Sequence, residues 1–185
     1  MSRFLSLARI VHLAILALVL GAVAHAQVPA ATPAALQGVD AYAAMDLANA
    51  WKGQPVTSYV TPRAVHFAFP DGQEVEVALP DDVMLVSVAP FLVNTHPCLT
   101  HTMSGCQGEL VAAPFHVRAV LADGTVVIDE VRPTMANGFV DLWLPRGHAV
   151  ELSFELDGYR TVGVVTTHDD SPTCITTLQL SRSGG

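Results

Sequence analysis

The chain has 185 residues, of which 51% are hydrophobic and only 14% are charged, a composition typical of a folded core and not of a disordered chain. It carries 9 basic against 17 acidic residues, a formal net charge of −8 with histidine neutral. Nucleic acids and anionic membranes attract basic surfaces, so this charge argues against both as partners.

The first 26 residues have the layout of a secretory signal peptide. Arg3 and Arg9 begin it, residues 10–23 are almost wholly apolar, and residues 24–26 (AHA) form a cleavage pattern before Gln27. The apolar run is shorter than the roughly 20 residues that span a bilayer, so we expect cleavage and no membrane anchor. About 159 residues then remain, with a charge of −10, outside the cytoplasm where disulfides can persist.

A leader, a helix and a hairpin are predicted next. Residues 27–38 are rich in proline and alanine and carry no charge, which indicates a flexible leader. Apolar residues at three- and four-residue spacing predict a helix over residues 39–52. Alternating apolar residues on both sides of Pro70-Asp71-Gly72 predict a β-hairpin. We assign the helix and the hairpin to a small N-terminal lobe, residues 39–80.

The rest of the chain predicts strands. The run VMLVSVAPFLV, residues 83–93, is nearly continuous in apolar character, which indicates a strand buried on both faces. Later segments alternate and are separated by turns such as Asp157-Gly158, the pattern of an antiparallel β-sandwich. The predicted fold class is therefore mainly β, α+β overall, with residues 81–185 as a C-terminal sandwich. The passage 121–159 also resembles transthyretin-like sandwich modules.

One loop collects soft, electron-rich side chains. Residues 95–110 (THPCLTHTMSGCQGEL) contain the donors His96, Cys98, His101, Met103 and Cys106. Thiolate, thioether and imidazole suit copper(I), and thiolate and imidazole also suit zinc as a competitor. A plain disulfide between the two loop cysteines explains them equally well without a metal.

The third cysteine lies close to the C-terminus. Cys174 begins the last predicted strand, and an odd number of cysteines leaves one without a disulfide partner inside the chain. If this strand pairs beside the strand at 83–93, an antiparallel arrangement brings Cys174 to the mouth of the cysteine loop. We then expect the three sulfurs to lie together, with His168 and the loop histidines nearby.

Two motifs occur in order along the chain. The loop reads His-x-Cys-x2-His-x4-Cys-Gln-Gly-Glu-Leu over residues 96–110, and the C-terminal strand reads Thr-Cys-Ile-Thr-Thr-Leu over residues 173–178. With NGFVDLWLPR at 137–146, they resemble the CueP family of periplasmic copper-binding proteins. The resemblance implies a periplasmic protein for copper homeostasis and tolerance. It also implies copper(I) bound by Cys98, Cys106 and Cys174, with His96 and His101 assisting.

Redox chemistry follows from the same residues. A disulfide between Cys98 and Cys106 would disable the site until a reductase opens it, and the reduced pair could reduce copper(II) stoichiometrically. The partners we expect are a copper ion, a thiol–disulfide reductase and a copper-recipient protein. The apolar N-terminal helix and hairpin also suit a homodimer.

Two other functions stay open at this point. One is a thiol redox enzyme that acts on copper or on disulfides, although the chain has no CxxC motif before a helix. The other is a disulfide-stapled interaction module without metal. We expect a binding protein before an enzyme, with no catalytic residue assigned.

Overall fold

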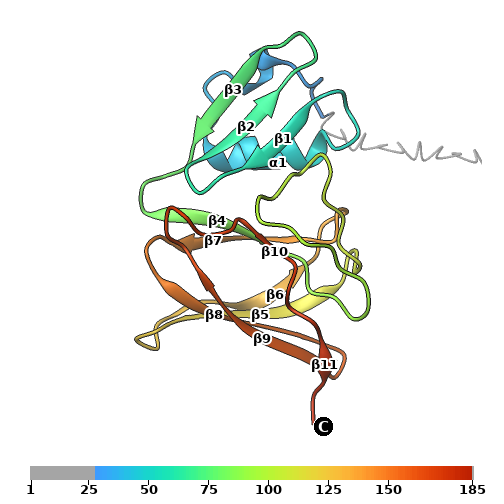
Figure 1. Ribbon diagram of the computed structural model, residues 1–185, viewed down its shortest axis with the longest axis vertical. Helices are drawn as coiled ribbons and strands as arrows, with labels where there is room; N and C mark the ends of the chain where they lie inside the picture. Colours follow the sequence, from blue (N-terminus) through green and yellow to red (C-terminus); the bar gives the residue numbers. More distant parts are fainter. Residues whose placement is uncertain (1–27, 185) are drawn as a thin grey trace, which may run out of the picture.

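The computed structural model describes residues 28–184 (Figure 1). This part of the chain contains three β-sheets and one α-helix. The predicted fold class, mainly β with a small helical part, is confirmed. The predicted signal peptide at residues 1–26 lies outside the described residues. Between residues 28 and 184, none of the helices has the length and apolar character needed to cross a bilayer.

The N-terminal layer consists of a short helix and a small sheet. Helix α1 (Ala41–Ala50) is capped by Asp40, whose carboxylate accepts a hydrogen bond from the Ala43 amide at 2.9 Å. The antiparallel sheet has the order β1-β2-β3, with bounds β1 (Thr57–Val60), β2 (Ala64–Ala68) and β3 (Glu74–Ala78). The predicted helix and hairpin are confirmed, whereas β1 was not predicted because its four residues are too few to show alternation.

The segment 28–38 is packed, in contrast to the predicted flexible leader. A short 3-10 helix, η1 (Pro33–Leu36), buries Leu36 against the N-terminal layer. The Pro29 carbonyl accepts a hydrogen bond from the Trp51 indole at 2.8 Å, and the Ala31 amide donates to the Gln54 side chain at 2.9 Å. Alanine and leucine in this segment therefore act as core residues.

Two further sheets lie face to face below the helix (Figure 1). The middle sheet has the order β10-β4-β7, with bounds β4 (Val83–Val88), β7 (Val140–Pro145) and β10 (Cys174–Ile175). The outer sheet has the order β11-β9-β8-β5-β6, with bounds β5 (Pro114–Leu121), β6 (Val126–Pro133), β8 (Ala149–Leu156), β9 (Tyr159–Thr166) and β11 (Ser181–Arg182). Apolar side chains from both sheets fill one core between them.

Strand β4 is buried on both faces, as predicted. Met84 and Val86 pack into the core shared with the outer sheet, while Leu85 packs into the core around α1. The middle sheet is thus covered by the outer sheet on one side and by α1 on the other. This double coverage explains why the sequence of β4 is nearly continuous in apolar residues.

Strand β10 pairs with β4, as predicted, but in parallel instead of antiparallel orientation. Cys174 lies opposite Ser87, and Ile175 opposite Val88. The chain reaches β10 from β9 in the outer sheet, so no hairpin dictates an antiparallel direction. The predicted direction was therefore wrong, although the predicted neighbour was correct.

Arg146 joins the N-terminal layer to the middle sheet. Its guanidinium donates to the carbonyls of Pro62 at 2.8 Å, Val83 at 2.9 Å and Asp81 at 3.2 Å. The side chain is only 12% exposed, and it also contacts Asp169 at 3.3 Å. Arg63, by contrast, pairs with Asp169 at the exposed surface.

Arg146→Met should destabilise the protein by about 2–4 kcal/mol, because charge-assisted bonds are lost and partly buried carbonyls are left without a donor. Arg63→Met removes an exposed ion pair and should cost less than about 1 kcal/mol. Urea unfolding of both variants measures the difference. Equal losses would show that Arg146 does not hold the layers together.

Candidate metal centre

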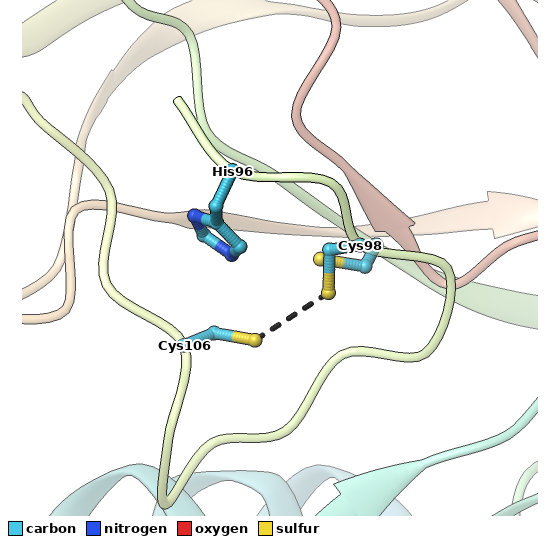
Figure 2. Close-up of side chains that lie close together, drawn as sticks. His96, Cys98 and Cys106 are labelled. Carbon is cyan, nitrogen blue, oxygen red and sulfur yellow. Dashed lines mark hydrogen bonds between the residues drawn. The ribbon is translucent and has the colours of Figure 1, made fainter. Parts of the chain in front are cut away.

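Three thiols and one imidazole converge beside the edge of the middle sheet. The ligand atoms of His96, Cys98, Cys106 and Cys174 all lie within 4.8 Å of one another. Figure 2 shows the sulfurs of Cys98 and Cys106 facing each other, with the His96 ring beside them. The two sulfurs are 3.5 Å apart. All three cysteines are free thiols, because 3.5 Å is far longer than a disulfide bond.

The spacing of the sulfurs fits a metal ion at their centre. A metal–sulfur bond of about 2.3 Å places three sulfurs of a planar trigonal site about 4 Å apart. The observed group lies within 4.8 Å, so three-sulfur coordination needs only small side-chain shifts. The predicted convergence of the three sulfurs is confirmed.

Two threonines of the C-terminal motif fix the loop against β10. The Thr173 hydroxyl accepts from the His101 amide at 3.0 Å and donates to the Val60 carbonyl at 2.7 Å. The Thr176 hydroxyl donates to the His96 carbonyl at 2.6 Å. Both ends of the segment that carries Cys98 are therefore tied to the strand that carries Cys174.

Cys106 is held by a turn and by a lysine. Its amide donates to the Thr102 carbonyl at 2.8 Å, and its own carbonyl accepts from the Lys52 ammonium at 2.7 Å. Lys52 also donates to the Gln107 side chain at 2.8 Å. Sequence reasoning missed Lys52, although a signal was present, since it is the one lysine in the sequence.

The residues after Cys106 explain the Gln-Gly-Glu part of the motif. Gly108 donates its amide to the Asn137 carbonyl at 2.7 Å and lies so close to Gly138 that a Cβ would meet its oxygen at 2.5 Å. The Glu109 carboxylate accepts from the amides of Leu92 at 2.6 Å and Val93 at 3.0 Å. These hydrogen bonds lower the pKa of Glu109 and anchor the start of the loop.

The two loop histidines differ in position. His96 belongs to the four-donor group, whereas His101 is outside that group, with Nδ1 3.8 Å from the Cys174 sulfur and its ring against Phe139. Among residues 28–184, the Nε2 atoms of both rings are buried without a hydrogen-bond partner. Buried polar atoms are rarely left unpaired, so this pair indicates that the cluster takes a ligand.

The pKa values of the three thiols are shifted in different directions. A hydrogen bond from the Cys174 thiol lowers the pKa of Cys106, and contacts from His101 and His96 lower it further. The same hydrogen bond, together with burial, raises the pKa of Cys174, and burial raises that of Cys98. These contacts favour the thiolate form at Cys106 over the thiolate form at Cys98 or Cys174.

Two other predicted neighbours lie elsewhere. Met103 is fully buried in the core around α1, so its role is packing, one of the two readings that the sequence allows. His168 lines a surface cavity with Arg63, Arg146 and Asp169, outside the thiol group, because the turn after β9 precedes the crossing into β10. The expectation that His168 approaches the thiols was wrong.

Together, the layered fold and the soft donor cluster define a candidate metal-binding protein. A family model described as periplasmic copper-binding protein CueP matches residues 40–179, so the chain belongs to the CueP family. A structure titled "Crystal Structure of S.CueP" is similar, with 30% identity, a TM-score of 0.73, and coverage of 80% of this chain and 92% of that chain. No match was found among curated proteins. The predicted family membership is confirmed.

Gly108→Ala should destabilise the protein by about 2–3 kcal/mol, because the new methyl group meets backbone atoms that cannot move aside. Gly105→Ala is the matched control in the same loop. Its Cβ would lie 3.7 Å from the Thr102 side chain, an ordinary contact, so stability should change by less than about 0.5 kcal/mol. Thermal unfolding of the reduced proteins tests this contrast, and equal stabilities would contradict it.

Proposed function

We propose that this protein captures copper in the periplasm and holds it as copper(I) between the thiolates of Cys98, Cys106 and Cys174. The observation that carries the proposal is the convergence of three free thiols within reach of one ion. The family description, periplasmic copper-binding protein, supports both the metal and the compartment.

The donor set favours copper(I) over copper(II). Thiolates are soft ligands that suit copper(I), and three of them complete a trigonal site. The surroundings are apolar, since Cys98, Cys106 and Cys174 pack with Ala89 and Phe139. Zinc prefers four ligands and would need His96 as the fourth, so we expect zinc to compete for the same group.

The close pair of loop thiols supports copper(II) reduction during capture. Cys98 and Cys106 lie 3.5 Å apart, so a small movement joins them. In a balanced reaction, two copper(II) ions each take one electron, the two thiols form one disulfide, and two protons are released. The oxidised protein keeps only Cys174 as a thiol, so a reductant such as a thiol–disulfide reductase must return two electrons before copper(I) binds again. Reduction is therefore stoichiometric unless that partner acts.

The histidines assist the thiols in this proposal. The contacts of His96 and His101 lower the pKa of Cys106 and so favour the nucleophilic, metal-binding thiolate. Their unpaired Nε2 atoms are also suited to an incoming copper(II) ion, because imidazole binds copper in both oxidation states. Three thiolates then satisfy copper(I) without a strong fourth ligand.

Cys174→Ser should weaken copper(I) binding at least about 100-fold, or roughly 2.7 kcal/mol, because it removes one of three thiolates. Competition with a copper(I) chelator on the reduced full-length protein measures the affinity. Thr177→Ser is the control, because Thr177 is an exposed residue of the same motif. Thiol counting should show three protected cysteines in the copper-loaded wild type. Unchanged affinity in Cys174→Ser, or equal copper(I) affinity before and after oxidation, would contradict the three-thiolate site.

The double variant His96→Ala/His101→Ala should keep its copper(I) affinity within about tenfold, roughly 1.4 kcal/mol, while copper(II) reduction slows much more. Chelator competition gives the affinity, and stopped-flow detection of copper(I) gives the rate. His116→Ala, at an exposed histidine paired with Asp129, is the control. A loss of copper(I) affinity by several orders of magnitude would show that the histidines are direct ligands.

A further inference from the structure

The one lysine of the chain reaches from the N-terminal layer to the thiol cluster. Lys52 follows the C-terminal end of α1, and its ammonium donates to the Cys106 carbonyl at 2.7 Å and to the Gln107 side chain at 2.8 Å. All other basic residues in the sequence are arginines. Cys106 thus contacts a residue that is 54 positions away in the chain.

Cys106 has hydrogen bonds at both of its peptide groups, and Lys52 makes one of them. The Thr102 carbonyl accepts the Cys106 amide at 2.8 Å, so the turn fixes the peptide before Cys106. Lys52 fixes the peptide after it. With both peptides held, the Cys106 sulfur has only its own side-chain rotation to adjust, which keeps it facing the other two sulfurs.

The C-terminal end of α1 also contacts a second segment that lies beside the cysteine loop. Asn49, one turn before Lys52, donates to the Asp141 carboxylate at 3.0 Å and accepts from the Asn137 amide group at 3.1 Å. The Asn137 carbonyl in turn accepts the Gly108 amide at 2.7 Å. The end of α1 therefore contacts the loop directly through Lys52 and indirectly through Asn137.

Charge gives Lys52 a second effect. Three thiolates around one copper(I) carry a net charge of −2, and a partly buried anion is costly without a nearby positive charge. The Lys52 ammonium is in hydrogen-bond contact with the Cys106 peptide and supplies that charge. Lysine can do this as a compact ammonium, whereas the planar arginine fork has a different geometry.

We propose that Lys52 is a positioning residue of the metal centre: its ammonium holds Cys106 in place for three-thiolate coordination and offsets the negative charge of the occupied site. This inference rests on the proposed function above. It assigns to the N-terminal layer a direct part in metal binding, through a contact with the backbone of a ligand instead of with the metal.

The first test compares copper(I) affinities of reduced full-length variants by chelator competition. Lys52→Met keeps the apolar stem and removes the donor and the charge, and we expect about a tenfold loss. Gln107→Ala removes the second acceptor of Lys52, together with the long hydrogen bonds from the Gln107 amide to the Gly108 and Ala136 carbonyls, and should stay within about threefold of wild type. Arg182→Met removes a distant exposed charge and should have no effect. A Lys52→Met affinity within twofold of wild type, or equal losses in Lys52→Met and Gln107→Ala, would overturn the proposal.

A second test observes Lys52 itself in the wild-type protein. Selective 15N labelling of lysine side chains gives a single ammonium resonance in the wild-type protein. One equivalent of copper(I) should shift this resonance, and the shift should disappear in Cys174→Ser. An unmoved resonance in protein whose three thiols are protected by copper(I) would overturn the role of Lys52 alone. Failure of the wild type to bind copper(I) would instead overturn the proposed function.

Discussion

The pairing of β10 with β4 is the contact on which the thiol cluster depends. Strand β4 leads directly into the loop that carries Cys98 and Cys106, and β10 begins with Cys174. Only the register that sets Cys174 opposite Ser87 brings a residue from the end of the chain to a loop more than sixty positions earlier. Both faces of β4 are buried in apolar cores. One edge of β4 pairs with β7, and its other edge pairs with β10.

The local chemistry of the site was predictable because it resides in short motifs. The spacing of His96, Cys98, His101 and Cys106 marks one loop, and the convergence with Cys174 followed from placing the last strand beside residues 83–93. The burial of β4 on both faces was equally predictable, because a nearly continuous apolar run indicates it whichever elements cover the two faces. The loop motif and the apolar run of β4 each lie within one short segment, whereas the position of Cys174 required an assumption about which strands pair.

The features that the sequence did not reveal depend on contacts between distant segments. The parallel direction of β10 is set by its crossing from β9, which no local pattern encodes. The Lys52 contact joins the end of α1 to the loop, and Gly108 is needed only because Gly138 lies against it. Met103 has a soft sulfur, but its side chain is buried with α1, and burial cannot be inferred from a donor type.

The small size of β10 limits the free energy that retains Cys174. The strand has two residues, and its attachment to the loop includes the hydroxyl bonds of Thr173 and Thr176 and backbone bonds to the Leu99 carbonyl. Each such hydrogen bond contributes on the order of 1 kcal/mol net, far less than the free energy of global unfolding. A local opening of this segment would expose the innermost thiol while both large sheets stay intact. The innermost thiol of the cluster is therefore within reach of an exchange reaction that leaves the rest of the fold unchanged.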